Sequence, residues 1–240
     1  MRGFVDLHCH WVAGIDDGAK TPEDGVAILK ALGRLGFAQV LATPHMRPGL
    51  FDNSREELSA AFERMAPHLG AGLPEVALSS EHYFDDVVFT RLMNGEGLPY
   101  PGGHAVLLEF YESDFPLSID RRFADLRVKK RLIPVIAHPE RYQRIWRDPE
   151  VLERLVDAGA AALLDAAALV GKYGRRPKKT AEELLERGLY HAACSDAHRA
   201  SDVAEVGAGM NRIQELYGPE EVDFLFREGP LALLSGKIPE

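Results

Sequence analysis

Residues 6–10, with the sequence Asp-Leu-His-Cys-His, combine two histidines with a spacing that suits metal binding. In an extended strand, side chains at positions i and i+2 point to the same side. His8 and His10 are therefore expected to reach one metal ion together. Asp16 and Asp17 follow in a glycine-containing loop that can fold back over the same place. Imidazole and carboxylate groups are typical ligands of divalent cations. The stretch predicts a metal site, and the alternative is a surface pair of histidines beside a solvated turn.

Similar polar residues recur at the ends of other predicted strands. Seven short apolar segments alternate with helix signals, over residues 4–8, 38–43, 76–80, 105–108, 133–137, 161–164 and 190–194. This alternation predicts an α/β fold with a parallel sheet, most simply a closed or nearly closed barrel. Six of the seven strands end in residues able to bind a metal, namely His8 with His10, His45, Glu81, Glu109, His138, and Asp196 with His198. Because β/α barrels carry their chemistry at the carboxyl ends of the strands, these side chains are expected to meet at one rim.

Helix signals lie between the strands. Thr21 followed by Pro22 is typical of an N-cap and a first helical residue. Ser54 begins a capping-box pattern. Further helices are expected over 86–94, ended by Gly95; over 119–131; from a cap at 148–150 to Gly159; over 180–187; and from 203 onward, broken at Pro219 and Pro230. The remaining histidines are interpreted as outside the site: His68, His82, His104 and the barrel-wall residue His191.

Composition limits the classes of partner. The chain has 240 residues, 46% of them hydrophobic, which suits one large domain over 1–240. The formal net charge of -9 argues against nucleic acid as a partner, because phosphate backbones require a basic surface. A small phosphorylated substrate stays compatible, since bound cations would add local positive charge.

The cysteine count and apolar runs predict a compartment. The two cysteines, Cys9 and Cys194, do not form a disulfide framework and favour a reducing environment. We expect no signal peptide, because no apolar run precedes the first polar cluster. No segment reaches the roughly 18 apolar residues of a membrane span. The sequence therefore predicts a soluble, cytoplasmic protein without a membrane span.

Five motifs together resemble those of the PHP (polymerase and histidinol phosphatase) superfamily. They are His8-Cys9-His10, Ala42-Thr43-Pro44-His45, Ser80-Glu81, Ala137-His138-Pro139 and Ser195-Asp196-Ala197-His198. Segments 14–20 and 136–142 extend the likeness. The whole chain thus resembles the bacterial manganese-dependent protein tyrosine phosphatases of capsule and exopolysaccharide systems.

The resemblance implies a distorted, seven-stranded (β/α)7 TIM-like barrel that holds three divalent metal ions. It suggests manganese, while the ligand chemistry suits Fe or Zn equally. The first ion would be held by His8, His10, Glu81 and Asp196. The second would share Glu81 and add Glu109 and His138. The third would take His45, His198 and an acid of the 16–17 pair, with Asp17 preferred and Asp16 as the alternative ligand or a supporting residue.

The resemblance also assigns roles in hydrolysis. Arg141 resembles the arginine that binds the substrate phosphate, with Arg199 and Arg47 as weaker candidates whose alternative is a solvated surface charge. A metal-activated hydroxide would attack phosphorus, and Asp196 could assist as an acid. Two departures concern substrate choice: Ser79-Ser80 replaces the more common Gly-Ala, and Asp165 stands where relatives tend to have Asn.

A cysteine mechanism fits poorly. Thiolate phosphatases place an arginine six residues after the cysteine, and the corresponding positions here are Ile15 and Ala200.

The leading hypothesis is a metal-dependent phosphatase acting on phosphotyrosine proteins, with the tail of a bacterial tyrosine kinase as a candidate substrate. A small-molecule phosphatase such as histidinol phosphatase and a non-catalytic module of the same fold are the alternatives. The basic segment 121–131 is interpreted as a solvated helix face, with docking of an acidic or tyrosine-rich tail as the other interpretation. The oligomeric state and the existence of a cognate kinase stay open.

Overall fold

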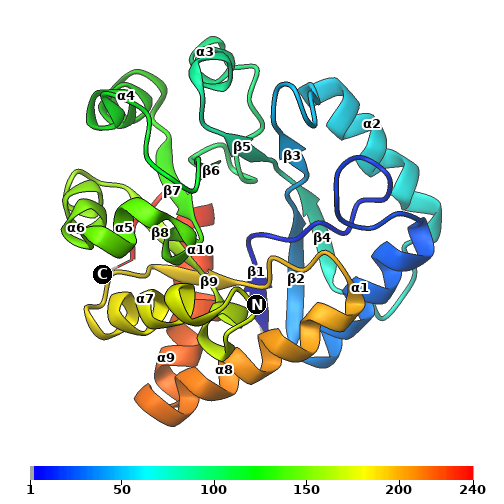
Figure 1. Ribbon diagram of the computed structural model, residues 1–240. Coiled ribbons are helices and arrows are strands. Elements are labelled where there is room, and N and C mark those ends of the chain that lie inside the picture. Colours follow the sequence, from blue (N-terminus) through cyan, green and yellow to red (C-terminus); the bar gives the residue numbers. More distant parts are fainter. Residues whose placement is uncertain (1–2, 240) are drawn as a thin grey trace.

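The strands form the centre of the molecule, and helices surround them (Figure 1). The computed structural model describes residues 3–239. Within these residues the strand segments are β1 (Phe4–Asp6), β2 (Phe37–Ala42), β3 (His45–Met46), β4 (Glu75–Leu78), β5 (Glu81–Tyr83), β6 (Ala105–Glu109), β7 (Ile133–Ala137), β8 (Ala161–Asp165) and β9 (Ala192–Cys194). Every pairing between them is parallel. The predicted α/β class with parallel strands is confirmed.

Two of the predicted strands are each divided in two. One sheet has the order β1-β2-β4 and the other β3-β5-β6-β7-β8-β9. Thr43 and Pro44 separate β2 from β3, and Ser79 and Ser80 separate β4 from β5. Pro44 has no N–H to donate to a neighbouring strand, and its carbonyl accepts a hydrogen bond from the Ser80 hydroxyl at 2.8 Å. The predicted barrel count of seven strands is not confirmed, because the described residues form nine segments in two sheets.

Backbone contacts join the two sheets beyond the ends of β1 and β9. The amide of His10 donates to the Ala197 carbonyl at 3.0 Å, and the amide of Asp196 donates to the His8 carbonyl at 3.0 Å. These bonds connect the segment after the first strand to the segment after the last. The predicted ligands at the two ends of the sequence are thus brought to the same rim.

The helices follow most of the predicted signals. They are α1 (Pro22–Arg34), α2 (Arg55–Met65), α3 (Asp86–Asn94), α4 (Ile119–Asp125), α5 (Gln143–Arg147), α6 (Glu150–Asp157), α7 (Arg175–Glu186), α8 (Val203–Tyr217), α9 (Pro219–Asp223) and α10 (Gly229–Leu234). The capping boxes at Thr21 and Ser54 are both formed. Gly95 ends α3 with φ of 81°, a left-handed conformation that favours glycine. A π-helical turn continues α4 over Leu126–Lys130.

Two helix starts differ from the prediction. Asp148 does not cap α6 with its side chain, which bonds Arg144 instead; its backbone carbonyl accepts from the Val151 amide. Helix α7 begins at Arg175, five residues before the predicted start at Thr180. Pro177 lies in its first turn, where the missing N–H has no helical partner to lose.

The core has two parts that follow the alternation of the strands. On β6, Val106 and Leu108 belong to the cluster that also contains helix residues such as Leu29 and Val88. Their neighbour Leu107 belongs to a second cluster, on the face of the sheet away from those helices. This two-residue period is the one expected when both faces of a parallel sheet are buried.

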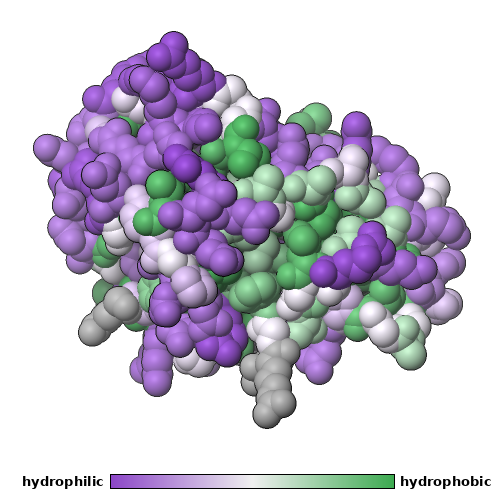
Figure 2. Space-filling view, turned by 90° about the horizontal axis from the view of Figure 1, so that it is seen from below, coloured by the Kyte–Doolittle hydropathy of each residue, from purple (hydrophilic) through white to green (hydrophobic). Residues whose placement is uncertain are grey.

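The outer surface is mainly polar. Figure 2 shows one face on which hydrophilic side chains predominate at the upper left and apolar ones gather toward the middle and right. The large hydrophobic side chains exposed among the described residues are Leu50, Val87, Tyr111, Leu117, Val128, Val170, Leu216 and Tyr217. Within residues 3–239, none of the helices has the length and apolar character to cross a membrane.

His191 gives the fold a measurable pH dependence. Its side chain is buried, its Nδ1 accepts a hydrogen bond from the Ala162 amide at 3.1 Å, and burial lowers its pKa from 6.5 to about 4. Below about pH 6.5 His191 therefore binds a proton in the unfolded chain but stays neutral in the folded chain until the pH approaches 4. Stability from the neutral ring is complete above pH 6.5 and is lost as pH falls toward 4, by about 3 kcal/mol at most.

We predict that His191→Asn, which keeps an acceptor near the Nδ1 position but does not titrate, is less sensitive to acid. Urea unfolding at pH 7 and pH 5 should show a larger loss of free energy of unfolding in the parent chain than in the variant. An equal loss in the two proteins would contradict a neutral, acid-sensitive His191.

Candidate metal centre

All nine predicted ligands lie at one rim of the strands. Each belongs to a group whose potential ligand atoms are within 4.8 Å of one another. The groups are His8 with His10 and Glu81; His8 with His138 and Asp196; His45 with Glu81 and Glu109; and His10 with Asp17, His45 and His198. Residues from both ends of the chain and from its middle are thus within reach of shared ions.

The first group is built around two buried carboxylates. His8 Nε2 lies 3.3 Å from Glu81 Oε1 and 3.1 Å from Asp196 Oδ1. His10 Nε2 lies 3.5 Å from Glu81 Oε2 and 3.3 Å from Asp196 Oδ1. The four residues expected to hold the first ion are therefore adjacent.

The second group differs from the expected trio. Glu109 lies with His45, whose Nδ1 is 3.6 Å from Glu109 Oε2 and 3.0 Å from Glu81 Oε2. His138 contacts the other oxygen of Glu81, with its Nε2 3.0 Å from Oε1. Glu81 consequently connects both sides of the centre, and His45 is within reach of two of the groups.

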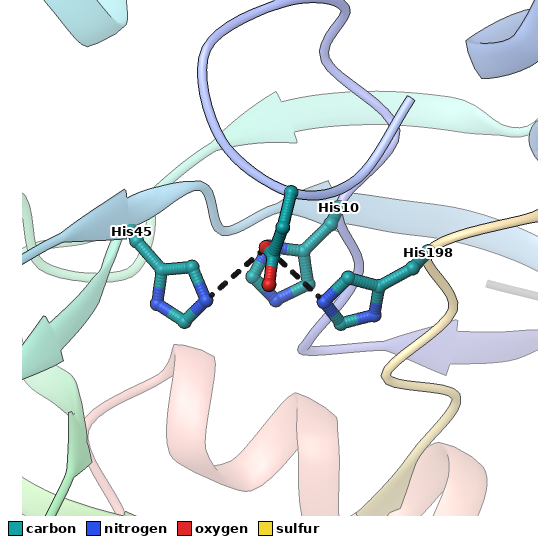
Figure 3. A group of neighbouring side chains, drawn as sticks. His10, His45 and His198 are labelled. Carbon is teal, nitrogen blue, oxygen red and sulfur yellow. Dashed lines mark ion pairs between the residues drawn. The ribbon is translucent and has the colours of Figure 1, made fainter. Parts of the chain in front are cut away.

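The third group surrounds Asp17. Its Oδ1 lies 3.5 Å from His45 Nε2 and 3.4 Å from His198 Nε2, the two ion pairs drawn as dashed lines in Figure 3. The rings of His10 and His198 stack with centroids 4.2 Å apart. Because the Asp17 side chain is about half exposed, this group forms the open side of the centre.

Asp16 has a different position from Asp17. Its carboxylate lies 2.7 Å from His10 Nδ1 and accepts hydrogen bonds from the amides of Gly18 and His45. A carboxylate on one ring nitrogen directs the other nitrogen to a metal. Thr43 Oγ1 contacts His8 Nδ1 at 2.6 Å in the same manner. Asp16 and Thr43 therefore orient the imidazoles whose Nε2 atoms face Glu81.

Several buried atoms of the centre make no hydrogen bond of acceptable geometry among the described residues, although some lie 3.0–3.3 Å from an oppositely charged group. They are His8 Nε2, His10 Nε2, His45 Nδ1, Glu109 Oε2, His138 Nδ1 and Asp196 Oδ1. Leaving a buried polar atom unpaired costs about 1–3 kcal/mol, so such a concentration is unusual outside a site. The unpaired atoms are imidazole nitrogens and carboxylate oxygens, the donor set of divalent transition metals. The residues present therefore fit a metal centre.

The electrostatics of the centre favour positive charge. Burial lowers the pKa of His8, but the Glu81 and Asp196 carboxylates outweigh it and raise the value to about 10. Burial and the neighbouring Glu81 raise the pKa of Glu109 to about 7. Crowded carboxylates that raise imidazole pKa values are equally able to attract a metal cation.

Arg141 lies against the centre. Its guanidinium bonds the carboxylates of Asp196 and Asp165 and the hydroxyl of Tyr173 at 2.9 Å, and it stacks on the Tyr173 ring. Neither Asp165 nor Tyr173 was predicted as a site residue, and Asp165 was noted from the sequence only as a departure that concerns substrate choice. Its place at the end of β8, at the same rim, could have predicted a contact with the site; Tyr173 lies in a later loop and gives no comparable signal.

The two weaker arginine candidates lie on different sides. Arg47 is 3.9 Å from Glu109 and its guanidinium lies over the Tyr83 ring. Arg199 is exposed and lines a hollow beside His198 with Lys20. Arg47 is therefore the one of the two with a direct contact to a potential ligand.

Neither cysteine is placed for nucleophilic chemistry. Cys9 and Cys194 are fully buried and unpaired, and burial raises the pKa of both thiols. A reactive thiolate requires the opposite, a lowered pKa and access to substrate.

Comparison with known proteins identifies a family. The model of the family described as "Capsular polysaccharide synthesis, CpsB/CapC" matches residues 4–235. The chain is 31% identical over 202 residues to tyrosine-protein phosphatase YwqE of Bacillus subtilis, covering 81% of this chain and 77% of that protein. It is 25% identical over 244 residues to tyrosine-protein phosphatase CpsB of Streptococcus pneumoniae, covering 98% and 100%. The predicted resemblance is confirmed.

Solved structures agree. One matching crystal structure belongs to a study of YwqE from Bacillus subtilis and CpsB from Streptococcus pneumoniae, which are described as "unique metal-dependent tyrosine phosphatases". It has a TM-score of 0.88 at 28% identity, covering 97% of this chain and 95% of that one. A phosphotriesterase homology protein from Escherichia coli has a TM-score of 0.56 at 13% identity, a likeness of fold alone.

The positions of Asp16 and Asp17 generate a prediction. Asp17→Asn should lower the number of metal ions bound per chain at saturating metal, because it weakens the oxygen ligand between His45 and His198. Asp16→Asn should keep that number and weaken affinity about 10- to 100-fold, the usual effect of losing an orienting partner. Metal titration followed by elemental analysis measures both.

Asp157→Asn, on the exposed end of α6, is the matched control and should behave as the parent chain. Loss of an ion in Asp16→Asn with full content in Asp17→Asn would reverse the assignment.

Proposed function

The chain belongs to the capsular polysaccharide synthesis CpsB/CapC family, and we propose that it is a metal-dependent protein tyrosine phosphatase. The observation that carries the proposal is the set of buried, unpartnered imidazole and carboxylate atoms at one rim of the strands. That rim also holds an arginine suited to phosphate oxygens. The chain is accordingly a phosphoric monoester hydrolase.

We propose three metal ions, with manganese as the first candidate and Fe or Zn as alternatives. His8, His10, Glu81 and Asp196 would hold the first, and Asp17, His45 and His198 the third. Glu81, Glu109 and His138 are proposed for the second. The distances add His45 as a further neighbour of that position.

When bound, the metal ions supply Lewis acidity to the phosphoryl group and to the attacking water. The chain's own contribution is orientation and charge. Asp165 and Tyr173 hold the Arg141 guanidinium at the rim, where it would bind the equatorial oxygens of the phosphate.

Asp196 fits the role of a ligand better than that of an acid. Although burial raises its pKa, Arg141 and His8 outweigh that effect and hold the value well below its usual range. The tyrosine leaving group has a pKa of about 10 and needs less protonation than an alkoxide.

The open side of the centre supports a protein substrate. Asp17 is about half exposed and His198 about a quarter exposed, so a side chain on a folded or extended protein can approach there. We propose a role in regulating capsule or exopolysaccharide synthesis, with the tail of a tyrosine kinase as a candidate substrate. We further propose that the chain works as one domain over 1–240 in the cytoplasm, as its two unpaired cysteines suggest.

A comparison of substrates tests the proposal. Phosphate release from a phosphotyrosine peptide at fixed Mn²⁺ should be fast. EDTA should abolish it, because the side chains of the site cannot replace the Lewis acidity of the removed metal ions. Histidinol phosphate, measured in parallel, should react much more slowly. Preference for histidinol phosphate would move the protein to small-molecule metabolism, and no release from either with metal bound would favour a non-catalytic module.

Arg141 gives a second prediction. Arg141→Ala should lower kcat on a phosphotyrosine peptide about 10²- to 10³-fold, the usual cost of removing one charge-stabilising donor. Metal content at saturating metal should not change, since Arg141 is not a ligand. Arg144→Ala, which changes a more exposed arginine three residues later in α5, is the control and should retain activity. Loss of metal together with activity would make Arg141 structural.

A further inference from the structure

An apolar groove lies beside the metal centre. It has a volume of about 590 Å³ and lies between the segments that follow β5 and β6. We call it the Tyr111 groove, and its apolar walls are Phe84, Val87, Tyr111, Phe115, Pro116 and Leu117. Leu117 is 89% exposed, Tyr111 60% and Val87 49%. Single exposed apolar residues need no explanation, but a contiguous set of them marks an interaction site.

The groove is continuous with the metal centre. A second hollow of about 330 Å³ is lined by Glu109, Arg47 and Tyr83 and shares Tyr111 and Ser113 with the Tyr111 groove. Glu109 is one of the nine potential ligands. A chain bound at the centre can therefore pass from Glu109 along Tyr111 into the groove without leaving the surface.

An unpartnered polar group lies along this path. The Tyr83 hydroxyl is buried and has no hydrogen-bond partner among the described residues, and the Tyr83 residue is 4% exposed. Arg47 covers its ring, with the guanidinium carbon 4.1 Å from the ring centroid. A peptide backbone in the hollow would supply the missing hydrogen bond, since each residue offers both a donor and an acceptor.

The exposed walls stand on a fixed support. The Gln143 amide donates to the Glu112 carbonyl at 2.7 Å. Phe115 packs against Phe110 and Tyr142, with ring centroids 5.0 and 5.5 Å apart. The segment after β6 is thus anchored on one side, while the Tyr111 and Leu117 side chains stay outside. A preformed apolar surface of this kind binds without first having to order itself.

The charges around the groove are mainly negative. Asp85, Asp86 and Asp114 line it, and Arg122 is the one cation among its lining residues. Arg122 is already ion-paired with Asp86 and lies over the Phe89 ring. This part of the basic segment 121–131 is therefore attached to the protein, in contrast to the solvated face predicted for it. An occupant with a positive charge complements this rim, and an acidic one is repelled.

We propose that the Tyr111 groove binds the peptide segment flanking the phosphotyrosine, and that it selects an apolar side chain followed by a basic one. The inference rests on the proposed phosphatase function, of which it specifies the substrate class. An extended segment places successive side chains about 3.3 Å apart along the path, so the selected residues lie within a few positions of the phosphotyrosine.

The experiment compares phosphotyrosine peptides in a glycine-serine background. One carries Leu and Lys beside the phosphotyrosine, one carries Ser and Lys, and one carries Leu and Glu; each is made with the pair on either side. We expect kcat/KM for the Leu-Lys peptide to exceed that for each of the others about tenfold, equivalent to about 1.4 kcal/mol, on one side only.

Variants assign the preference to the groove. Leu117→Asn should lower the ratio of kcat/KM for the Leu-Lys peptide to that for p-nitrophenyl phosphate, which has no flanking residues. Val128→Asn is the matched control, because Val128 is an apolar residue outside the groove that is also highly exposed, at 79%, and it should leave the ratio unchanged. Circular dichroism of both variants checks that they fold.

The outcomes separate this inference from the function on which it rests. Hydrolysis of all three peptides at equal rates, or an unchanged kcat/KM ratio in Leu117→Asn, would overturn the proposal that the groove binds the flanking segment. The proposed phosphatase activity would be unaffected. Preference for the Leu-Glu peptide would overturn the charge selection. Failure of the parent chain to hydrolyse any phosphotyrosine peptide or p-nitrophenyl phosphate would overturn both.

Discussion

The Glu81 carboxylate is fully buried, and four imidazole rings surround it. His8 and His138 face one of its oxygens, and His10 and His45 face the other, at 3.0–3.5 Å. A buried carboxylate is stable only when positive charge or hydrogen bonds compensate for its lost hydration. The four histidines come from three separate parts of the sequence, so this one requirement fixes how those parts must meet. A positive charge, supplied either by a proton or by a metal cation, must therefore lie between these groups for the rim to keep its structure.

The interrupted strands are what bring Glu81 and His45 into this position. In the register of β3 and β5 the two residues are direct partners. Both segments begin just after a break, at Thr43-Pro44 in one strand and at Ser79-Ser80 in the other. The breaks occur side by side, and the hydrogen bond from Ser80 to the Pro44 carbonyl connects them. The same two strands are therefore paired before and after their breaks, as β2 with β4 and as β3 with β5, and the breaks lie where the side chains change from core to site.

Much of this could be predicted from the sequence. The strand-end rule placed eight of the nine potential ligands at one rim, because parallel strands present their carboxyl ends together. The ninth, Asp17, was predicted from the loop after the first strand and from the family resemblance. The grouping of those ligands was less accessible: His45 lies nearer to Glu81 and Glu109 than expected, since side-chain direction after a strand end depends on local backbone turns. His138 and Asp196 illustrate the difficulty, with φ of 35° and 42°. Positive φ values are uncommon for residues other than glycine, and no pattern in the sequence predicts them at these two positions.

Those two backbone conformations also indicate how the site is maintained. A positive φ at a non-glycine residue costs about 1–3 kcal/mol and persists only where the surroundings impose it. For Asp196 two interactions impose it. The backbone amide of Asp196 donates a hydrogen bond to the His8 carbonyl, and its carboxylate is ion-paired with Arg141, which Asp165 also contacts. The strained backbone of Asp196, a potential ligand, together with unsatisfied imidazole nitrogens and crowded carboxylates, opposes folding of the metal-free chain. A cation that binds the folded state alone offsets them by mass action. The same contacts therefore determine both how stable the rim is without metal and how tightly it would bind a metal ion.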